Sequence, residues 1–90
     1  MDMKHIHKQF FNNFNVVTYK RNAFISRSRH LDVQELVEIC WDIFPYVDNI
    51  YFYPFGKVLV RDLKKLLILK NQMRIMDVTF NLEEGYYEDF

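Results

Sequence analysis

Apolar residues recur every three or four positions in residues 33–44, VQELVEICWDIF, and this spacing predicts an amphipathic helix. Asp32 precedes the run and Glu35 lies three residues further on, which resembles a capping box with aspartate as the capping residue. Pro45 is expected to end the helix, because the residue before a proline avoids helical backbone angles. The apolar stripe consists of Val33, Leu36, Val37, Cys40 and Phe44.

Helical spacing also occurs near the start of the chain, within residues 1–14. The apolar residues there are Met3, Ile6, Phe10 and Phe14. They predict a short amphipathic helix over residues 3–13.

A third stretch, residues 62–72, is compatible with two structures. Leu63, Leu66 and Leu67 fall on one face of a helix, and Asp62 could cap its start. The run LLIL within it is also compatible with a strand. The periodicity favours the helix.

Other stretches alternate or are rich in β-forming residues. VVTYKRNAFIS, residues 16–26, contains two such runs and predicts one bent strand or a tight hairpin. NIYFY and KVLVR flank Pro54-Phe55-Gly56, which predicts a hairpin with Gly56 at a positive φ. RIMDVTFNL, residues 74–82, predicts a strand with Met76, Val78 and Phe80 on one face.

From residue 15 onward the predicted order is βαββαβ, as in ferredoxin-like folds. We therefore expect an α+β protein with a small antiparallel sheet, two helices on one face and an added N-terminal helix. Residues 1–90 are expected to form a single domain with an α+β core over residues 15–81. Residues 82–90 are acidic and aromatic and are expected to form a frayed tail.

The net charge is zero, but the charges are segregated along the chain. Residues 1–30 and 49–74 each carry six basic side chains and one acidic one. Residues 31–48 and 75–90 each carry five acidic side chains and no basic one. These blocks either pair within the fold or form a bipolar surface that orients a charged partner.

No catalytic or cofactor-binding constellation can be assembled from the sequence. Glycine occurs only at positions 56 and 85, so there is no phosphate-binding loop. His5 and His7 form an isolated H-x-H pair, which is typical of solvated histidines. Glu35, Glu38 and Asp42 share one predicted helix face but lack a second element to complete a cation site. We expect no enzymatic activity, no metal and no cofactor.

The cysteine count and the lengths of the apolar runs indicate in which cellular compartment the protein is expected. Cys40 is the only cysteine, which excludes an intrachain disulfide, and its place on the apolar stripe predicts a buried thiol. No apolar run is long enough for a signal peptide or a membrane span. A cytoplasmic location, in the host cytosol if the protein is viral, and no membrane association are expected.

The aromatic content, 18%, exceeds what a small core requires, so some rings are expected at the surface. In the predicted hairpin, Tyr51 and Tyr53 point away from Ile50 and Phe52 and lie beside Lys57 and Arg61. Tyrosine and arginine are enriched in the residues that dominate protein interfaces. These four residues are the predicted contact surface, and Tyr86 and Tyr87 of the tail are candidates for a second contact.

A neutral, motif-free and aromatic-rich chain of 90 residues is typical of proteins with which phages and mobile elements block host machinery, anti-CRISPR proteins among them. We expect an inhibitor that binds a host protein or nucleoprotein complex, as a monomer or homodimer. The alternative is a module that binds single-stranded nucleic acid by stacking bases on the tyrosines. The strand KVLVR lacks the rings that RNA-recognition domains carry on their third strand.

Overall fold

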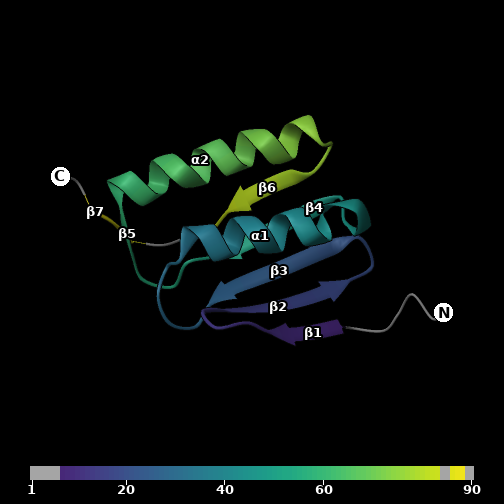
Figure 1. Cartoon of the computed structure of the whole chain (residues 1–90), viewed down its shortest axis with the longest axis horizontal. Helices are drawn as coiled ribbons and strands as arrows, with labels where there is room; N and C mark the ends of the chain where they lie inside the picture. The colour runs from purple at the N-terminus through teal and green to yellow at the C-terminus, as the bar shows by residue number, and fades with distance from the viewer. Residues whose placement is uncertain (1–6, 84–85, 89–90) are drawn as a thin grey trace.

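The computed structural model describes residues 7–83 and 86–88. A five-stranded sheet forms one layer and two helices form the other, and two short strands make a small separate sheet (Figure 1). In chain order the elements are β1 (His7–Phe10), β2 (Phe14–Tyr19), β3 (Asn22–Arg27), α1 (Val33–Ile43), the 3-10 turn η1 (Phe44–Tyr46), β4 (Asn49–Tyr53), β5 (Lys57–Leu59), α2 (Val60–Ile75), β6 (Thr79–Leu82) and β7 (Tyr86–Glu88).

The main sheet has the strand order β1-β2-β3-β4-β6. Its first half is antiparallel, since β1 pairs with β2 and β2 with β3 in opposite directions. Its second half is parallel, because β4 lies parallel to both β3 and β6. The parallel strands are joined by crossovers that contain α1 and α2. Both crossovers step in the same direction across the sheet, and their common handedness places both helices on one face.

The predicted helix after Asp32 is confirmed. α1 begins at Val33, and the Asp32 carboxylate accepts a hydrogen bond from the Glu35 backbone N–H at 3.1 Å. This bond satisfies one of the unpaired donors of the first turn. The chain leaves α1 through η1, which contains Pro45.

The helical interpretation of residues 62–72 is also confirmed, although α2 is longer and begins earlier. Its N-cap is Leu59, which makes no side-chain cap, so the prediction that Asp62 caps this helix is wrong. Asp62 lies within the first turn instead. There its negative charge is favourable to the positive end of the helix dipole.

The core lies between the helices and one face of the sheet. The rings of Phe14, Phe52 and Phe80 are fully buried at its centre, with 5.9 Å between the ring centroids of Phe14 and Phe52 and 6.3 Å between those of Phe52 and Phe80. α1 contributes Leu36, Ile39 and Cys40, while α2 contributes Leu66, Leu69 and Met73. Strand alternation therefore selects one face for burial, as expected for Ile50 and Phe52.

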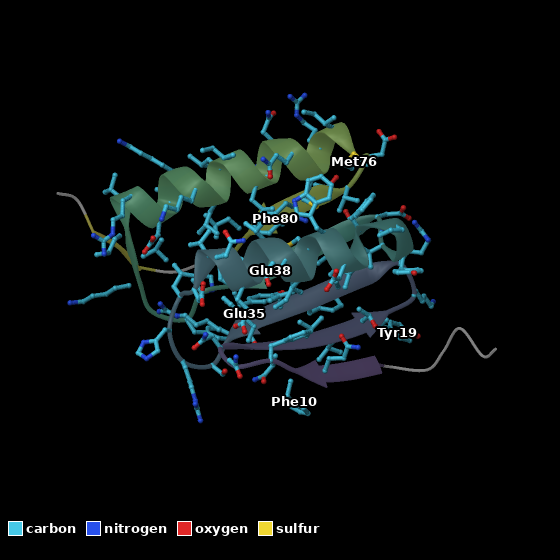
Figure 2. The ribbon with its side chains drawn as sticks, viewed as in Figure 1. Phe10, Tyr19, Glu35, Glu38, Met76 and Phe80 are labelled. Carbon is cyan, nitrogen blue, oxygen red and sulfur yellow. The ribbon has the colours of Figure 1, made fainter. Side chains whose placement is uncertain are left out.

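The predicted N-terminal helix is wrong over the described residues. His7–Phe10 is a strand whose register aligns Gln9 with Val16 and Phe10 with Asn15. Phe10 is 79% exposed, so it anchors no helix. Figure 2 shows its side chain at the β1 edge of the sheet. Ladder hydrogen bonds to β2 satisfy this backbone, whereas a lone short helix would be marginal. Met3 and Ile6 lie outside the described residues.

The hairpin predicted around Pro54-Phe55-Gly56 is also wrong. β4 pairs with β3 and β6, and β5 pairs with β7 instead. A strand has two edges, and β4 already uses both inside the main sheet. The ferredoxin-like order fails for the same reason, because a β1-β2-β3 meander comes first and β5 leaves the sheet. The turn keeps its expected positive φ at Gly56, at 155°, and Phe55 adopts 47°.

Two further predictions are resolved by the strand pairing. VVTYKRNAFIS forms the tight hairpin, with Tyr19 paired to Asn22 across Lys20 and Arg21. The segment predicted as a frayed tail contains β7, which pairs with β5 in parallel. β7 is therefore held by backbone hydrogen bonds over Tyr86–Glu88.

Candidate functional site: the open face of the sheet

The face of the main sheet opposite the helices is the candidate site, and we call it the open face. Figure 1 shows α1 and α2 on the same side of the strands. Strand register aligns the open-face residues in rows that cross the sheet, of which the central row runs Val17, Phe24, Tyr51, Asn81. The open face consists of Asn15, Val17, Tyr19, Asn22, Phe24, Ser26, Asn49, Tyr51, Tyr53, Thr79 and Asn81.

Aromatic rings dominate the middle of the open face. Phe24 and Tyr51 are neighbours on β3 and β4, and their rings stack with centroids 5.2 Å apart and planes 12° from parallel. Tyr53 stacks on Phe55 of the following loop at 5.7 Å, and Phe55 is 68% exposed. Mutual stacking restrains these rings before any partner arrives, which lowers the entropy lost on binding.

Amide side chains surround the rings. The Asn49 side chain donates a hydrogen bond to the Asn22 side chain at 3.2 Å. Asn81 donates to the backbone carbonyl of Ile50, also at 3.2 Å. Each amide has further donor or acceptor capacity beyond these bonds, so it can also bond to a partner.

The open face carries no charge on the described strands β2, β3, β4 and β6. Its polar groups are amides and hydroxyls. At the β1 edge the backbone register aligns Lys8 with Val17. Lys20 lies over the Tyr19 ring at 5.4 Å, at the hairpin end.

The predicted contact residues fall in different places. Tyr51 and Tyr53 lie on the open face, half-buried by their ring partners. Lys57 lies on β5 and Arg61 in the first turn of α2, so the paired strand that was to align them with the tyrosines is absent. Tyr86 and Tyr87 pair with Lys57 and Val58 through β7. Their side chains lie outside the described part of the chain.

Sequence reasoning missed Phe24, the closest ring neighbour of Tyr51. The alternation of Asn22, Phe24 and Ser26 with Ala23 and Ile25 was present in the sequence and indicates two faces. Its partner strand was not evident, because β3 and β4 are separated by all of α1. Only the parallel register brings Phe24 beside Tyr51.

Arg27 is a second residue whose role sequence reasoning did not find. Its guanidinium donates a hydrogen bond to the Lys57 backbone carbonyl at 3.3 Å and packs against Gly56. A Cβ atom at position 56 would collide with the Arg27 guanidinium. This contact holds the loop that presents Phe55 to Tyr53.

The remaining candidate catalytic and metal-binding side chains do not come together in one site. Burial raises the pKa of the Cys40 thiol to about 12, which confirms the predicted buried thiol and excludes a reactive thiolate near neutral pH. The described side chains contain no group of three or more His, Cys, Asp or Glu that could hold a metal ion. Glu35, predicted to share an exposed face with Glu38 and Asp42, instead accepts a hydrogen bond from the Asn13 backbone N–H at 3.0 Å.

Comparisons of the chain with protein-family models, curated proteins and solved structures find no match. In the described residues, neither helix has the length and apolar character needed to cross a membrane.

Proposed function

We propose that this protein is a non-enzymatic binding module whose open face contacts another protein. The observation that carries this proposal is the stacked Phe24–Tyr51 pair at the centre of an uncharged, amide-rimmed sheet face. The solvent-facing side of an antiparallel or mixed sheet usually carries charged and polar side chains. A face that replaces charge with rings, amides and hydroxyls has the composition of an interface core, where aromatic residues are enriched and charges depleted.

The lack of charge favours a protein partner over a nucleic acid. A nucleic-acid surface must neutralise phosphates with several basic side chains. On β2, β3, β4 and β6 the open face has no basic side chain, and Lys20 lies at the hairpin end beside the Tyr19 ring. Single-stranded nucleic acid is therefore the alternative outcome of the test rather than the proposal.

The narrower prediction is that the bound protein belongs to host machinery and is inhibited, as with the proteins phages use against their hosts. Its support is the size, neutral charge and lack of catalytic motifs of the chain. A binding module that blocks a partner needs only a surface of this kind, because steric occlusion requires no chemistry.

The test is affinity capture of the tagged protein from native or host lysate, with and without nuclease, read by mass spectrometry. The comparison variant is F24T/Y51T, since threonine keeps β-propensity while removing both rings. The control is Y46A, which removes a tyrosine that is exposed on η1 rather than on the open face.

We expect one protein to be retained in stoichiometric amount after nuclease, to be lost with F24T/Y51T and to be kept with Y46A. A protein retained equally by F24T/Y51T would contradict the placement of the site. Recovery abolished by nuclease, with affinity falling steeply as salt rises, would assign the same face to nucleic acid.

A further inference from the structure

The outward side of the helices, which we call the helical layer, exposes apolar residues that the core does not use. α2 buries Leu66, Leu69 and Met73, yet Ile68 and Ile75 are 59% and 69% exposed. They lie seven residues apart, so they share one face of the helix, on the side away from the sheet. A helix with apolar residues on its outer side as well as its core side offers a surface that a partner can cover.

A groove runs between the two helices beside these residues. It has a volume of about 470 Å³ and is open to solvent. Val37 of α1 and Ile68 of α2 line it, together with Lys65 and Gln72. Trp41, one helical turn after Val37, is 38% exposed. The groove is therefore lined by apolar and polar side chains in equal number, and the polar ones include Asp32, Asp62 and Lys65.

The two helices that border the groove have opposite charge. Within its span, α1 carries Glu35, Glu38 and Asp42 and no basic residue. α2 carries five basic residues against Asp62. Figure 2 labels Glu35 and Glu38 along α1. Among the described side chains, no ion pair joins the two helices, and Arg21 pairs with Asp48 at the hairpin end instead. The basic residues of α2 are Arg61, Lys64, Lys65, Lys70 and Arg74.

We infer that a second copy of this chain covers the helical layer, so that the protein is a two-fold symmetric dimer packed helices to helices. The helices run in the same direction, since each returns between parallel strands (Figure 1). A two-fold axis parallel to the helices places acidic α1 over basic α2 of the other copy, twice. An axis across the helices would place α1 over α1, where like charges repel. The charge pattern thus selects the first axis.

The size of the layer sets the strength expected of this dimer. α2 spans about 24 Å and the two helices are about 20 Å wide, from the rise and diameter of an α-helix. Each copy would therefore contribute a footprint of about 500 Å², or about 1,000 Å² in total. This lies at the lower limit of specific interfaces, where associations are weak, so a concentration-dependent dimer is expected.

The dimer has a consequence for the open face. Because the helical layers meet in the middle, the two open faces point outward on opposite sides. Each dimer would then present two identical contact surfaces. A partner that is itself multivalent would be held more tightly by the dimer than by either copy.

The first test is sedimentation equilibrium of the whole chain at concentrations up to about 100 μM, where any dissociation constant of about 10 μM or less gives mostly dimer. We expect a concentration-dependent mass that approaches twice 11.1 kDa. I68E, at an exposed position, is expected to remain folded by circular dichroism and to be monomeric. A monomeric wild type at that concentration, or an I68E protein that dimerises as well as the wild type, would overturn the inference.

The second test determines the direction of the two-fold axis relative to the helices. E38K/D42K makes both helices basic, and R61E/K64E/K65E makes both helices acidic, because α2 then carries two basic and four acidic side chains. Each variant alone is expected to raise the dissociation constant at least about tenfold, because like charges face each other. An equimolar mixture of the two is expected to form a heterodimer, since each α1 then meets an α2 of opposite charge.

R29E is the matched control, because it reverses an exposed charge in the loop before α1 and should leave the dimer unchanged. Normal dimerisation of both charge variants alone, or a mixture that stays monomeric, would overturn the proposed axis. Circular dichroism of each variant keeps unfolding from being mistaken for dissociation.

Discussion

The open face and the helical layer lie on opposite sides of one sheet, but they differ in where their charges lie. On β2, β3, β4 and β6 the open face has rings, amides and hydroxyls and no charge. The helical layer has an acidic helix beside a basic one, with a groove of mixed apolar and polar lining between them. The two proposed contact surfaces therefore differ in chemistry, with aromatic rings and amides on one side and a charge pattern on the other.

The largest expected effect is a loss of stability on replacing a residue of the core, which lies between the two surfaces. Phe52 of β4 is fully buried between Phe14 and Phe80, in the core that separates the sheet from the helices. Phe52→Ala is expected to lower the free energy of unfolding by about 3–5 kcal/mol, through lost burial and a cavity. Urea denaturation followed by circular dichroism measures this loss.

Phe55→Ala is the matched control, because the ring is exposed and only stacks on Tyr53. It should cost less than about 1 kcal/mol. Equal losses for the two phenylalanines would mean that the core does not lie where the structure places it.

A second prediction separates the two surfaces by salt. The dimer is expected to weaken as sodium chloride rises from about 50 mM to about 500 mM, because the Debye length shrinks from about 14 Å to about 4 Å. Binding of the captured partner by the open face should change little over the same range, since the face is uncharged. Sedimentation and titration calorimetry at matched salt concentrations test both. If salt weakened the dimer and partner binding by the same factor, the proposed difference between a charged and an uncharged surface would be wrong.

A third prediction concerns the loop between β4 and β5, which carries Phe55 beside the open face. Gly56→Ala introduces a Cβ into the Arg27 guanidinium at a φ of 155°, which favours glycine. We expect a loss of about 1–2 kcal/mol in the free energy of unfolding and weaker partner binding, with the dimer unchanged.

The double variant Arg27→Ala/Gly56→Ala tells the two causes apart. It removes the collision but keeps the backbone strain, so it should recover only part of the loss that Gly56→Ala causes. Complete recovery would mean that strain at Gly56 contributes nothing. No recovery would mean that the Arg27 contact is irrelevant.

Local signals predicted α1 well, because its cap and its apolar stripe lie within one short segment. Pairings between distant segments were not predictable in this way. Pro54-Phe55-Gly56 is a genuine turn signal, yet β4 finds its neighbours in β3 and β6, far away in the chain. The spacing of Ile6, Phe10 and Phe14 fits a helix, but Phe14 is core in β2 and Phe10 is surface in β1.

At the candidate site, too, local features were predictable from the sequence and contacts between distant segments were not. Alternation around Ile50 and Phe52 correctly oriented Tyr51 and Tyr53 away from the core. The charged half of the predicted surface, Lys57 and Arg61, depended on a hairpin that does not form. The replacement neighbour, Phe24, comes from a strand that only the parallel crossover brings alongside.

The smallest expected effect concerns Arg21 and Asp48, an exposed pair that belongs to neither surface. Arg21 Nε donates to the Asp48 carboxylate at 2.9 Å, and this hydrogen bond lowers the pKa of Asp48 below its usual value. A carboxyl group with a lowered folded-state pKa stabilises the fold above its unfolded pKa, near 4, and this stabilisation is lost as pH falls through the folded value. Arg21→Gln should therefore reduce stability slightly at pH 7, and this difference should disappear at acidic pH once Asp48 is protonated in the folded protein.

Thermal unfolding of wild type and Arg21→Gln at neutral and acidic pH tests this, with Arg29→Gln as the control for loss of an exposed charge. Because both partners are exposed, solvent screening keeps the difference small. A difference that persists at low pH would show that Arg21 acts through its packing rather than through Asp48.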